Sequence, residues 1–338
     1  MKEAQFYEVL SSKQARCRVC PRRCIIAEGK FGYCHTRVNK GGKIYSLIYG
    51  RIASLAVSPI EKKPMFHFYP GSLWLSLGSY GCNFRCPGCQ NWELAHAQVE
   101  EEAKKEKIIT PPELIEMAIT KGCRGISWTY NEPTIWLEYL KEGAEIAKAK
   151  GLLTNVVTNG YITAEALDYL GPFLDSFRMD LKGFKKETYA QIAHIDDFTP
   201  VLNSAERAKV KWRMHVEIIT NVIPGVNDDE EELKNIAWWI KDTLGKETPW
   251  HLTRFYPHYQ LAHLSPTRLE VLEKGRKIGL EVGLVFVYLG NVPGHEGENT
   301  YCPKCHSLLI RRWHLAILEN NLCQNKCKVC GFTLPGRF

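Results

Sequence analysis

The sequence predicts an α/β fold, a partial or complete TIM-like (β/α) barrel with small cysteine-rich metal-binding segments at both termini. Three observations support this prediction. Between Ser72 and Tyr288, short apolar runs rich in β-branched residues alternate with amphipathic stretches, the pattern of βα units around a parallel sheet. The chain has 338 residues, and an α/β barrel takes roughly 200 to 250. Eleven of its 13 cysteines fall into three groups, and two of these groups lie outside the alternating region.

The apolar runs are predicted as strands at residues 73–78, 125–130, 153–159, 176–181, 214–219, 252–256 and 282–288. The amphipathic stretches between them are predicted as helices at residues 112–121, 134–150, 164–170, 229–244 and 266–278. Pro111 and Pro112 mark a helix start, and Gly151 marks a helix end. Six or seven such units, joined by right-handed crossovers, make a partial or complete barrel. The charged run 100–107 predicts a solvated loop or helix surface.

We predict three segments: an amino-terminal cysteine-rich metal-binding segment with a linker at 1–70, the barrel at 71–292, and a zinc-ribbon or rubredoxin-like segment at 293–338. A composition of 45% hydrophobic and 24% charged residues is that of a globular protein and argues against disordered and fibrous classes. No apolar stretch approaches the roughly 18 residues of a membrane span, and the amino terminus lacks the apolar core of a signal peptide. We therefore expect a cytoplasmic protein without a membrane partner, whose clustered cysteines bind metal instead of forming disulfides.

The middle cysteine group consists of Cys82, Cys86 and Cys89, with the spacing C-x3-C-x2-C, directly after the first predicted barrel strand. Three thiolates are one short of closing a [4Fe-4S] cluster or a structural zinc site. The loop after a barrel strand lies at the carboxyl-terminal mouth, where active sites are built. The pattern thus favours a metal centre with one open position in a pocket. The alternative is a structural site with a remote fourth ligand.

This motif resembles that of the radical S-adenosylmethionine (radical SAM) enzymes. The segments T-Y-N-E-P-T, V-T-N-G, D-L-K-G, V-I-P-G-V-N-D and R-F-Y-P extend the resemblance over almost the whole chain. They point to the branch related to pyruvate formate-lyase activating enzyme, and within it to the radical enzyme of the AmmeMemoRadiSam system. The resemblance implies a [4Fe-4S] cluster that binds S-adenosylmethionine and cleaves it reductively to a 5′-deoxyadenosyl radical, which abstracts hydrogen from a substrate.

The resemblance also implies site residues. Cys82, Cys86 and Cys89 would hold the cluster. The cofactor contacts would come from the ends of the next three strands, namely Asn131, Glu132, Thr158, Asn159, Asp180 and Lys182. Asn159 with Gly160 is also a plain turn signal, and Asp180 with Lys182 could be a strand-end ion pair. In one departure from the family, Gly88 stands where most members place an aromatic ring near the adenine, so that Phe84, Trp92 or another ring would have to replace it.

Candidate substrate residues lie on the later strands. His215 and Glu217 alternate so that they share one face of their strand, and Arg254 and Tyr256 share a side opposite to that of His251. A polar side chain inside a barrel is costly unless it is paired or binds something. Each of these five residues is therefore a catalytic candidate, with a hydrogen-bonded structural role as the alternative.

The terminal cysteine groups predict further metal sites. Cys302, Cys305, Cys327 and Cys330 form two C-x2-C pairs, which is typical of structural zinc or of a rubredoxin-like iron. Cys17, Cys20, Cys24 and Cys34 could hold zinc or a second iron–sulfur cluster. A segment this short needs a metal for its stability in either case. Cys123 and Cys323 are expected to be spares.

The leading function is therefore a radical SAM oxidoreductase with an electron donor such as flavodoxin or ferredoxin. Its substrate is either a glycine of a partner protein, as in an activating enzyme, or a small molecule, peptide or RNA. A non-enzymatic zinc-binding interaction module is the distant alternative. The formal net charge is +7, and metal-bound thiolates lower it to about +2. The charge therefore argues against a nucleic-acid partner.

Overall fold

The computed structural model describes residues 1–338, which form two compact units. Unit 1 comprises Met1–Ser58, Leu73–Phe177 and Ile192–Met214, and unit 2 comprises Pro59–Ser72, Arg178–Gln191 and His215–Phe338. The three-segment division predicted from the sequence remains a prediction. No helix combines the length and the apolar composition that crossing a membrane requires.

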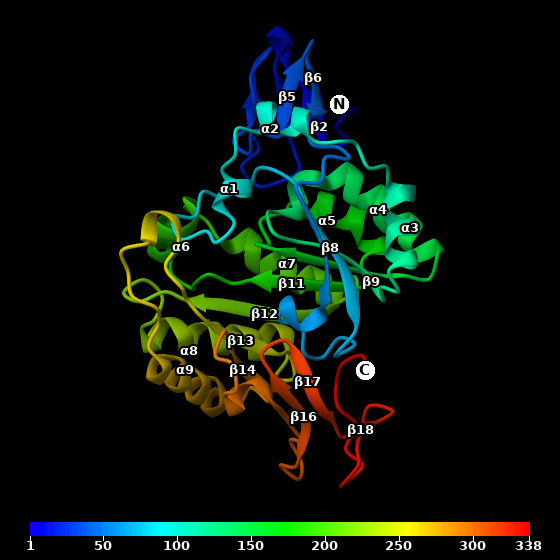
Figure 1. Ribbon diagram of the computed structural model, residues 1–338. Coiled ribbons are helices and arrows are strands. Elements are labelled where there is room, and N and C mark those ends of the chain that lie inside the picture. Colours follow the sequence, from blue (N-terminus) through cyan, green and yellow to red (C-terminus); the bar gives the residue numbers. More distant parts are fainter. The chain divides into compact units, whose positions relative to one another are not determined.

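Unit 1 begins with small antiparallel sheets around the first cysteine group. One has the order β1-β6-β5 and the other β2-β3-β4 (Figure 1). Their elements are β1 (Lys2–Glu3), β2 (Tyr7–Val9), η1 (Ser11–Lys13), β3 (Ala15–Cys17), β4 (Ile25–Ile26), β5 (Arg37–Lys40) and β6 (Lys43–Ser46). Buried Arg37 extends from β5 to Glu138 and pairs with both of its carboxylate oxygens, at 2.9 and 3.0 Å. This ion pair fixes the amino-terminal sheets to the α/β part of unit 1.

The α/β part of unit 1 contains the predicted alternation of strands and helices. Its strands are β7 (Ser54–Pro59, whose last residue belongs to unit 2), β8 (Leu73–Gly78), β9 (Gly125–Trp128), β10 (Leu153–Thr158) and the start of β11 (Ser176–Asp180). Its helices are α1 (Trp92–Ala95), α2 (Val99–Lys105), α3 (Pro111–Thr120), η3 (Pro133–Trp136), α4 (Leu137–Ala149), α5 (Ala164–Leu170), η4 (Gly171–Phe173) and α7 (Thr199–Val210). Pairing is parallel from β8 to β9 and from β9 to β10, with Gly125 beside both Trp74 and Leu153.

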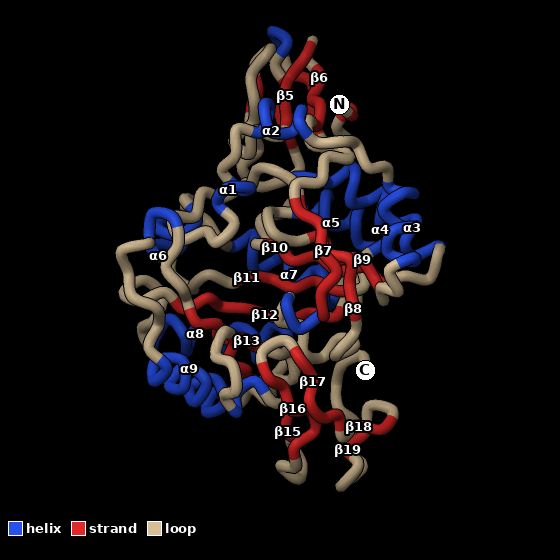
Figure 2. The backbone as a smooth tube through the Cα atoms, in the orientation of Figure 1, coloured by secondary structure: helices blue, strands red, loops and turns tan.

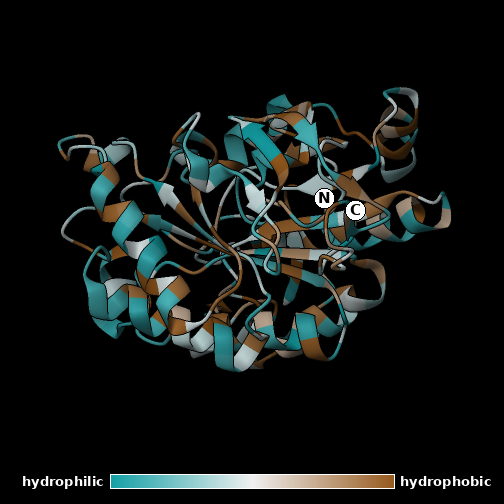
Figure 3. Ribbon diagram, turned by 90° about the horizontal axis from the view of Figure 1, so that it is seen from below, coloured by the Kyte–Doolittle hydropathy of each residue, from teal (hydrophilic) through white to brown (hydrophobic).

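Local signals explain where these helices start. Thr110 and Glu113 form a reciprocal capping box at α3, and the Thr163 side chain accepts a hydrogen bond from the Ala166 amide at the start of α5. Helices α3 and α4 lie side by side (Figure 2). The helices carry hydrophobic residues on one side and hydrophilic residues on the other (Figure 3), so that their apolar sides can be buried in the core.

Unit 2 contains the rest of the sheet and a helical layer. Its elements are η2 (Ile60–Lys62), the end of β11, most of α6 (Lys186–Ala193), β12 (His215–Val222), α8 (Glu230–Trp239), the π-helical η5 (Ile240–Leu244), β13 (Trp250–Arg254), η6 (Tyr259–Leu261), α9 (Leu269–Val282) and β14 (Val287–Gly290). Strands β12, β13 and β14 pair in parallel, and α8 and α9 lie side by side (Figure 1).

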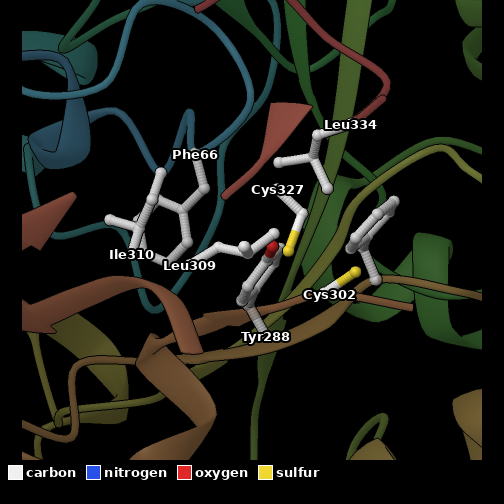
Figure 4. Close-up of a cluster of buried hydrophobic side chains, with 8 residues drawn as sticks. Phe66, Tyr288, Cys302, Leu309, Ile310, Cys327 and Leu334 are labelled. Atoms are coloured by element: carbon white, nitrogen blue, oxygen red, sulfur yellow. The ribbon is translucent and has the colours of Figure 1, made fainter. Parts of the chain in front are cut away.

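A small β module ends unit 2. It contains η7 (Glu296–Glu298), the antiparallel strands β15 (Thr300–Tyr301), β16 (Leu308–Trp313) and β17 (Ala316–Asn320), and the pair β18 (Leu322–Cys323) and β19 (Lys326–Cys327). Cys302 and Cys327 are buried with Phe66, Tyr288 and other apolar residues in one cluster (Figure 4). The predicted terminal metal segment is thus part of the core of unit 2.

The strand order is β14-β13-β12-β11-β10-β9-β8-β7, with β14 and β7 at the two edges of the sheet. The barrel is therefore not closed, and of the two predicted forms the open one is present. All seven predicted strands are found, the first with the predicted boundaries and the other six with shifted ones. The largest shift is at 282–288, because Val282 ends α9 and Gly283, with a left-handed φ of +106°, terminates that helix.

Some elements differ from the sequence prediction. Helices α6 and α7 occupy a stretch where no element was predicted, and β7 lies before the first predicted strand. The charged run 100–107 lies largely on α2, where Lys104 pairs with Glu100 and Lys105 with Glu102. Of the two interpretations given for that run, the helix surface is the better one.

Candidate active site

The three-cysteine motif lies in the loop after β8. Gly81 stands immediately before it with a φ of +83°, a left-handed conformation that glycine adopts without strain. A Cβ atom at this position would lie 2.6 Å from the carbonyl oxygen of Cys34 and 2.5 Å from Cγ2 of Thr36. The motif therefore begins where the chain packs closely against the amino-terminal cysteine segment, and glycine is required there.

Hydrogen bonds fix the conformation of this loop. The amide of Phe84 points to Sγ of Cys82 at 3.4 Å, and the Cys89 amide donates to the Cys86 carbonyl oxygen at 3.3 Å. The guanidinium of Arg85 donates to the carbonyl oxygens of Cys82, at 3.2 Å, and Tyr33, at 3.0 Å. An N–H group aimed at sulfur favours the thiolate, the form that binds iron.

Burial raises the pKa of Cys82 well above its usual value, and the nearby Glu132 carboxylate raises it further. A buried thiolate beside other acidic groups is stabilised by a bound cation. The residues therefore fit a [4Fe-4S] cluster, because three cysteines come from one loop that holds no fourth cysteine and provides a donor to sulfur.

The end of β10 is joined directly to this loop. The side-chain amide of Asn159 donates to the Asn83 side-chain oxygen at 2.8 Å and points to Sγ of Cys82 at 3.9 Å. Asn83 in turn donates to the carbonyl oxygen of Tyr161 at 2.9 Å. Asn83 was not among the predicted site residues. Its position next to Cys82 in the motif was the sequence feature that could have identified it as a site residue.

Glu132 follows β9 at the N-cap of η3 and is almost fully buried. One of its carboxylate oxygens accepts hydrogen bonds from the Thr134 amide at 2.9 Å and the Thr158 hydroxyl at 2.7 Å, and the other accepts from the Asn159 amide at 2.8 Å. Burial raises its pKa despite these donors. Glu132 thus links β9 to β10, and any contact with the cofactor would be made in addition to these three bonds.

Asn131 connects the same strand end to the cysteine loop. Its side-chain oxygen accepts from the Ser79 amide at 3.1 Å, and its side-chain nitrogen donates to the Gly81 carbonyl oxygen at 3.0 Å. Cys82, Asn131, Glu132 and Asn159 are therefore brought together in unit 1, and their roles toward the cofactor remain predictions.

Asp180 is the last residue of β11, and Lys182 follows it in unit 2. Arg178 approaches one Asp180 oxygen at 2.5 Å, whereas Nζ of Lys182 lies 3.9 Å from the other. The ion-pair alternative given for Asp180 and Lys182 is present, although its stronger partner is Arg178. Their roles toward the cofactor remain predictions.

Two rings were named as replacements for the aromatic residue missing at Gly88. Phe84 is buried, and its ring lies 5.3 Å from that of Tyr161, whereas Trp92 is 40% exposed. Phe84 is thus packed inside the protein, and Trp92 is the more solvent-accessible of the two rings.

Comparison with known proteins identifies the family. Residues 77–237 match the Radical SAM superfamily. An uncharacterised protein of Methanocaldococcus jannaschii is 44% identical over 333 residues, which cover 98% of each chain. The chain belongs to the radical SAM superfamily. Membership implies an enzyme with a [4Fe-4S] cluster and S-adenosylmethionine.

Two further matches are more distant. A second M. jannaschii protein, named for the activation of glycyl-radical enzymes, is 24% identical over 223 residues, covering 64% of this chain and 79% of that one. The solved structure of a radical SAM methyltransferase from Sphaerobacter thermophilus aligns with a TM-score of 0.51 over 66% of this chain and 68% of that one, at 15% identity. At such low identity this alignment indicates a shared fold alone.

In unit 2 of this radical SAM chain, Glu217 is the centre of a buried network. One carboxylate oxygen accepts from His215 at 2.9 Å and from the His67 amide at 2.8 Å, and the other accepts from His251 at 2.6 Å and from the Phe66 amide at 3.0 Å. Burial alone would raise the pKa of Glu217, but these donors outweigh it and lower that pKa well below its usual value. The structural alternative given for these residues is thus well supported.

His251 and His67 extend the network. Burial lowers the pKa of His251, so that the neutral ring donates through Nε2 to Glu217 and leaves Nδ1 without a partner. Burial also lowers the pKa of His67, to about 4. His67 bonds the Tyr288 hydroxyl at 2.7 Å and the Pro335 carbonyl oxygen at 2.8 Å. Nothing in the sequence pattern linked His67 to residues more than 200 positions away.

Arg254 and Tyr256 lie apart from this network. Arg254 donates to the Thr267 carbonyl oxygen at 2.8 Å, and Tyr256, which is 42% exposed, lies 3.4 Å from the Asn291 carbonyl oxygen. Their guanidinium and ring are 5.5 Å apart. Neither residue shares a hydrogen-bond partner with His251.

The carboxyl-terminal cysteines do meet. The Sγ atoms of Cys302, Cys305, Cys327 and Cys330 all lie within 4.8 Å of one another. Cys302 and Cys330 are 3.5 Å apart, and Cys305 and Cys327 are 3.7 Å apart. A tetrahedral site with four bonds of about 2.3 Å requires sulfur–sulfur separations of about 3.8 Å. The four residues thus fit a single metal ion.

Proposed function

We propose that this protein is a radical SAM enzyme that cleaves S-adenosylmethionine reductively and uses the resulting radical to abstract hydrogen from its substrate. The observation that carries the proposal is the three-cysteine loop at the carboxyl end of β8, in a parallel sheet. When bound, the cluster and cofactor supply one-electron cleavage of a C–S bond. The chain itself supplies ligands, orientation and a site that excludes water.

The residues of unit 1 have separate roles in binding and positioning the cluster and the cofactor. Cys82, Cys86 and Cys89 hold the cluster and leave one iron for the cofactor. Asn159 positions the loop through Asn83. Glu132 is held rigidly by donors from β10, and its negative charge favours an ammonium group nearby.

In unit 2, Lys182 is the candidate partner for a carboxylate and Asp180 for a ribose hydroxyl or a sulfonium. The electron donor we propose is a small carrier protein such as flavodoxin or ferredoxin, and the site of action is the cytoplasm.

The finer proposal is an activating enzyme that abstracts hydrogen from a glycine of a partner protein. The supporting observation is the similarity to a protein named for glycyl-radical enzyme activation. The AmmeMemoRadiSam branch, suggested by the sequence motifs, remains a prediction within the same proposal. The second candidate is radical modification of a small molecule, a peptide or RNA.

The test is anaerobic reconstitution with iron and sulfide, reduction with dithionite, and measurement of 5′-deoxyadenosine formed from S-adenosylmethionine. Wild type should produce it, and Cys86→Ala should not. Cys123→Ala, which removes a buried cysteine outside the motif, is the matched control and should retain activity. A wild-type protein that binds zinc alone and forms no 5′-deoxyadenosine contradicts the proposal.

The activating-enzyme form has its own test. Reduced protein and S-adenosylmethionine are mixed with a glycyl-radical enzyme encoded beside it or co-purified with it, and the mixture is examined by electron paramagnetic resonance (EPR). A protein-based doublet that needs both components supports activation. Formation of 5′-deoxyadenosine without any protein radical favours the second candidate.

A further inference from the structure

The amino-terminal cysteines lie around a pocket in unit 1. Cys17, Cys20, Cys24 and Cys34 all line it. Cys17 ends β3, and the β3–β4 hairpin brings Cys17 and Cys24 together, since the Cys17 amide donates to the Cys24 carbonyl oxygen at 2.9 Å. The Tyr33 amide points to Sγ of Cys24 at 3.5 Å, as an N–H group does toward a metal-bound thiolate.

This arrangement differs from that of the carboxyl-terminal group. There the four Sγ atoms all lie within 4.8 Å of one another, a spacing that suits the ligands of one metal ion. The amino-terminal four do not form such a group, although all four line the same pocket. The Sγ atoms of Cys82, Cys86 and Cys89 also do not form a group with the close spacing that suits one metal ion. A four-iron core holds its cysteines farther apart than one zinc ion does.

We propose that Cys17, Cys20, Cys24 and Cys34 bind a second iron–sulfur cluster, and that the carboxyl-terminal cysteines bind the single zinc ion. With four cysteine ligands this second cluster is closed and has no iron free for S-adenosylmethionine. The sequence left zinc and iron–sulfur open at this site, and the lack of single-ion spacing among the four sulfurs favours the larger centre. The assignment does not depend on which substrate the enzyme uses.

The amino-terminal cysteine site is in direct contact with the catalytic loop. Asn83, which follows Cys82, lines the amino-terminal pocket with its four cysteines. Arg22, between Cys20 and Cys24, donates to the Asn83 carbonyl oxygen at 2.6 Å. The contact of Gly81 with Cys34 adds a second connection. The two cysteine sites are therefore direct neighbours, and a redox-active centre in the amino-terminal segment would lie against the loop that holds the catalytic one.

The experiment counts metals in protein reconstituted anaerobically with iron and sulfide. Wild type should contain about eight irons and one zinc per chain, and Cys20→Ser should lose about four irons and no zinc. Cys302→Ser is the matched control at the other end of the chain and should lose zinc and no iron. A wild-type protein with about four irons and two zincs, whose Cys20→Ser variant loses one zinc, overturns the proposal.

A second variant keeps the test decisive if Cys20→Ser does not fold. The triple substitution of Cys82, Cys86 and Cys89 by Ala removes the catalytic cluster and leaves the amino-terminal site intact. This variant should retain about four irons and acid-labile sulfide, and after reduction it should give an EPR signal although it cannot cleave S-adenosylmethionine. Absence of iron from this folded variant overturns the second cluster, whatever the activity of the wild type.

Discussion

The side-chain amide of Asn159 donates a hydrogen bond of 2.8 Å to the side-chain oxygen of Asn83. This bond joins the carboxyl end of β10 to the loop that carries the three-cysteine motif. Asn159 also receives the Tyr161 amide on its own side-chain oxygen, at 2.9 Å. Both polar atoms of this buried side chain are thus hydrogen-bonded. The loop is therefore held in place by a residue at the end of the sheet as well as by hydrogen bonds within the loop.

Asn159→Leu should therefore weaken retention of the catalytic cluster. Leucine has the same number and branching of side-chain heavy atoms but cannot donate to Asn83, which leaves a buried acceptor unsatisfied at a cost of about 1–3 kcal/mol. We expect iron content after gel filtration to fall by roughly the share of one cluster. The matched control is Asn155→Leu on the same strand, whose amide donates to Ser127 away from the loop. It should destabilise the fold similarly and keep its iron, and equal iron loss in both variants would contradict this role.

Breaking the buried ion pair of Arg37 and Glu138 should cost more stability than breaking an ion pair on the surface. Both side chains are 2% exposed, so Arg37→Met leaves a buried carboxylate without its cation, at a cost of roughly 3–5 kcal/mol. The double variant Arg37→Met, Glu138→Met should recover part of this loss in urea unfolding. Lys43→Met breaks an exposed pair with Glu3 and should cost less than about 1 kcal/mol. A double variant less stable than Arg37→Met alone would contradict the argument.

The strand positions were predictable because buried parallel strands are continuous apolar runs. The end of α9 was not, since Val282 and the residues after Gly283 form one uninterrupted apolar stretch, and only the left-handed φ of Gly283 separates helix from strand. Helix α7 had a usable signal, with Pro200 in its first turn and buried Val201, Ala205 and Ala208 on one side. Helix α6 is short and carries few apolar residues, so its pattern was weak.

The site was predictable where chemistry lies within a short motif. The cysteines and the strand-end residues Asn131 and Asn159 fall into this class. The buried network of Glu217 was only half visible, because alternation placed His215 beside it but could not reveal the amides of Phe66 and His67 that occupy its oxygens. Such long-range contacts depend on tertiary packing, which a local pattern does not encode.

Loss of the carboxyl-terminal metal should destabilise unit 2, because Cys302 and Cys327 are part of its buried core (Figure 4). Cys302→Ser should release about one zinc per chain and lower the melting temperature. The matched control is Cys323→Ser, which changes an exposed cysteine outside the group. It should keep its zinc and its melting temperature. Zinc release is measured with a chromogenic chelator, and a metal-free Cys302→Ser variant with wild-type stability would contradict a structural role.

Acid should destabilise unit 2 through His67. Burial lowers the pKa of this residue to about 4, whereas an unfolded histidine titrates near about 6.5. Between these values the unfolded chain binds the proton and the folded one does not, so the free energy of unfolding falls as pH falls, by roughly 3 kcal/mol in total. The lowered pKa of Glu217 acts in the same direction at lower pH, since its stabilising contribution, present above the unfolded pKa, is lost as pH falls toward the folded one.

His67→Gln isolates this contribution to the pH dependence. Glutamine can donate to the Pro335 carbonyl oxygen and accept from the Tyr288 hydroxyl, as the neutral ring does, but it gains no proton. Urea unfolding between pH 7 and pH 4 should show a shallower loss of stability in this variant than in wild type. His263→Gln, on an exposed turn, is the matched control and should follow wild type. Parallel pH profiles for wild type and His67→Gln would mean that His67 is protonated in the folded chain, contrary to its burial and to the carbonyl and hydroxyl that flank it.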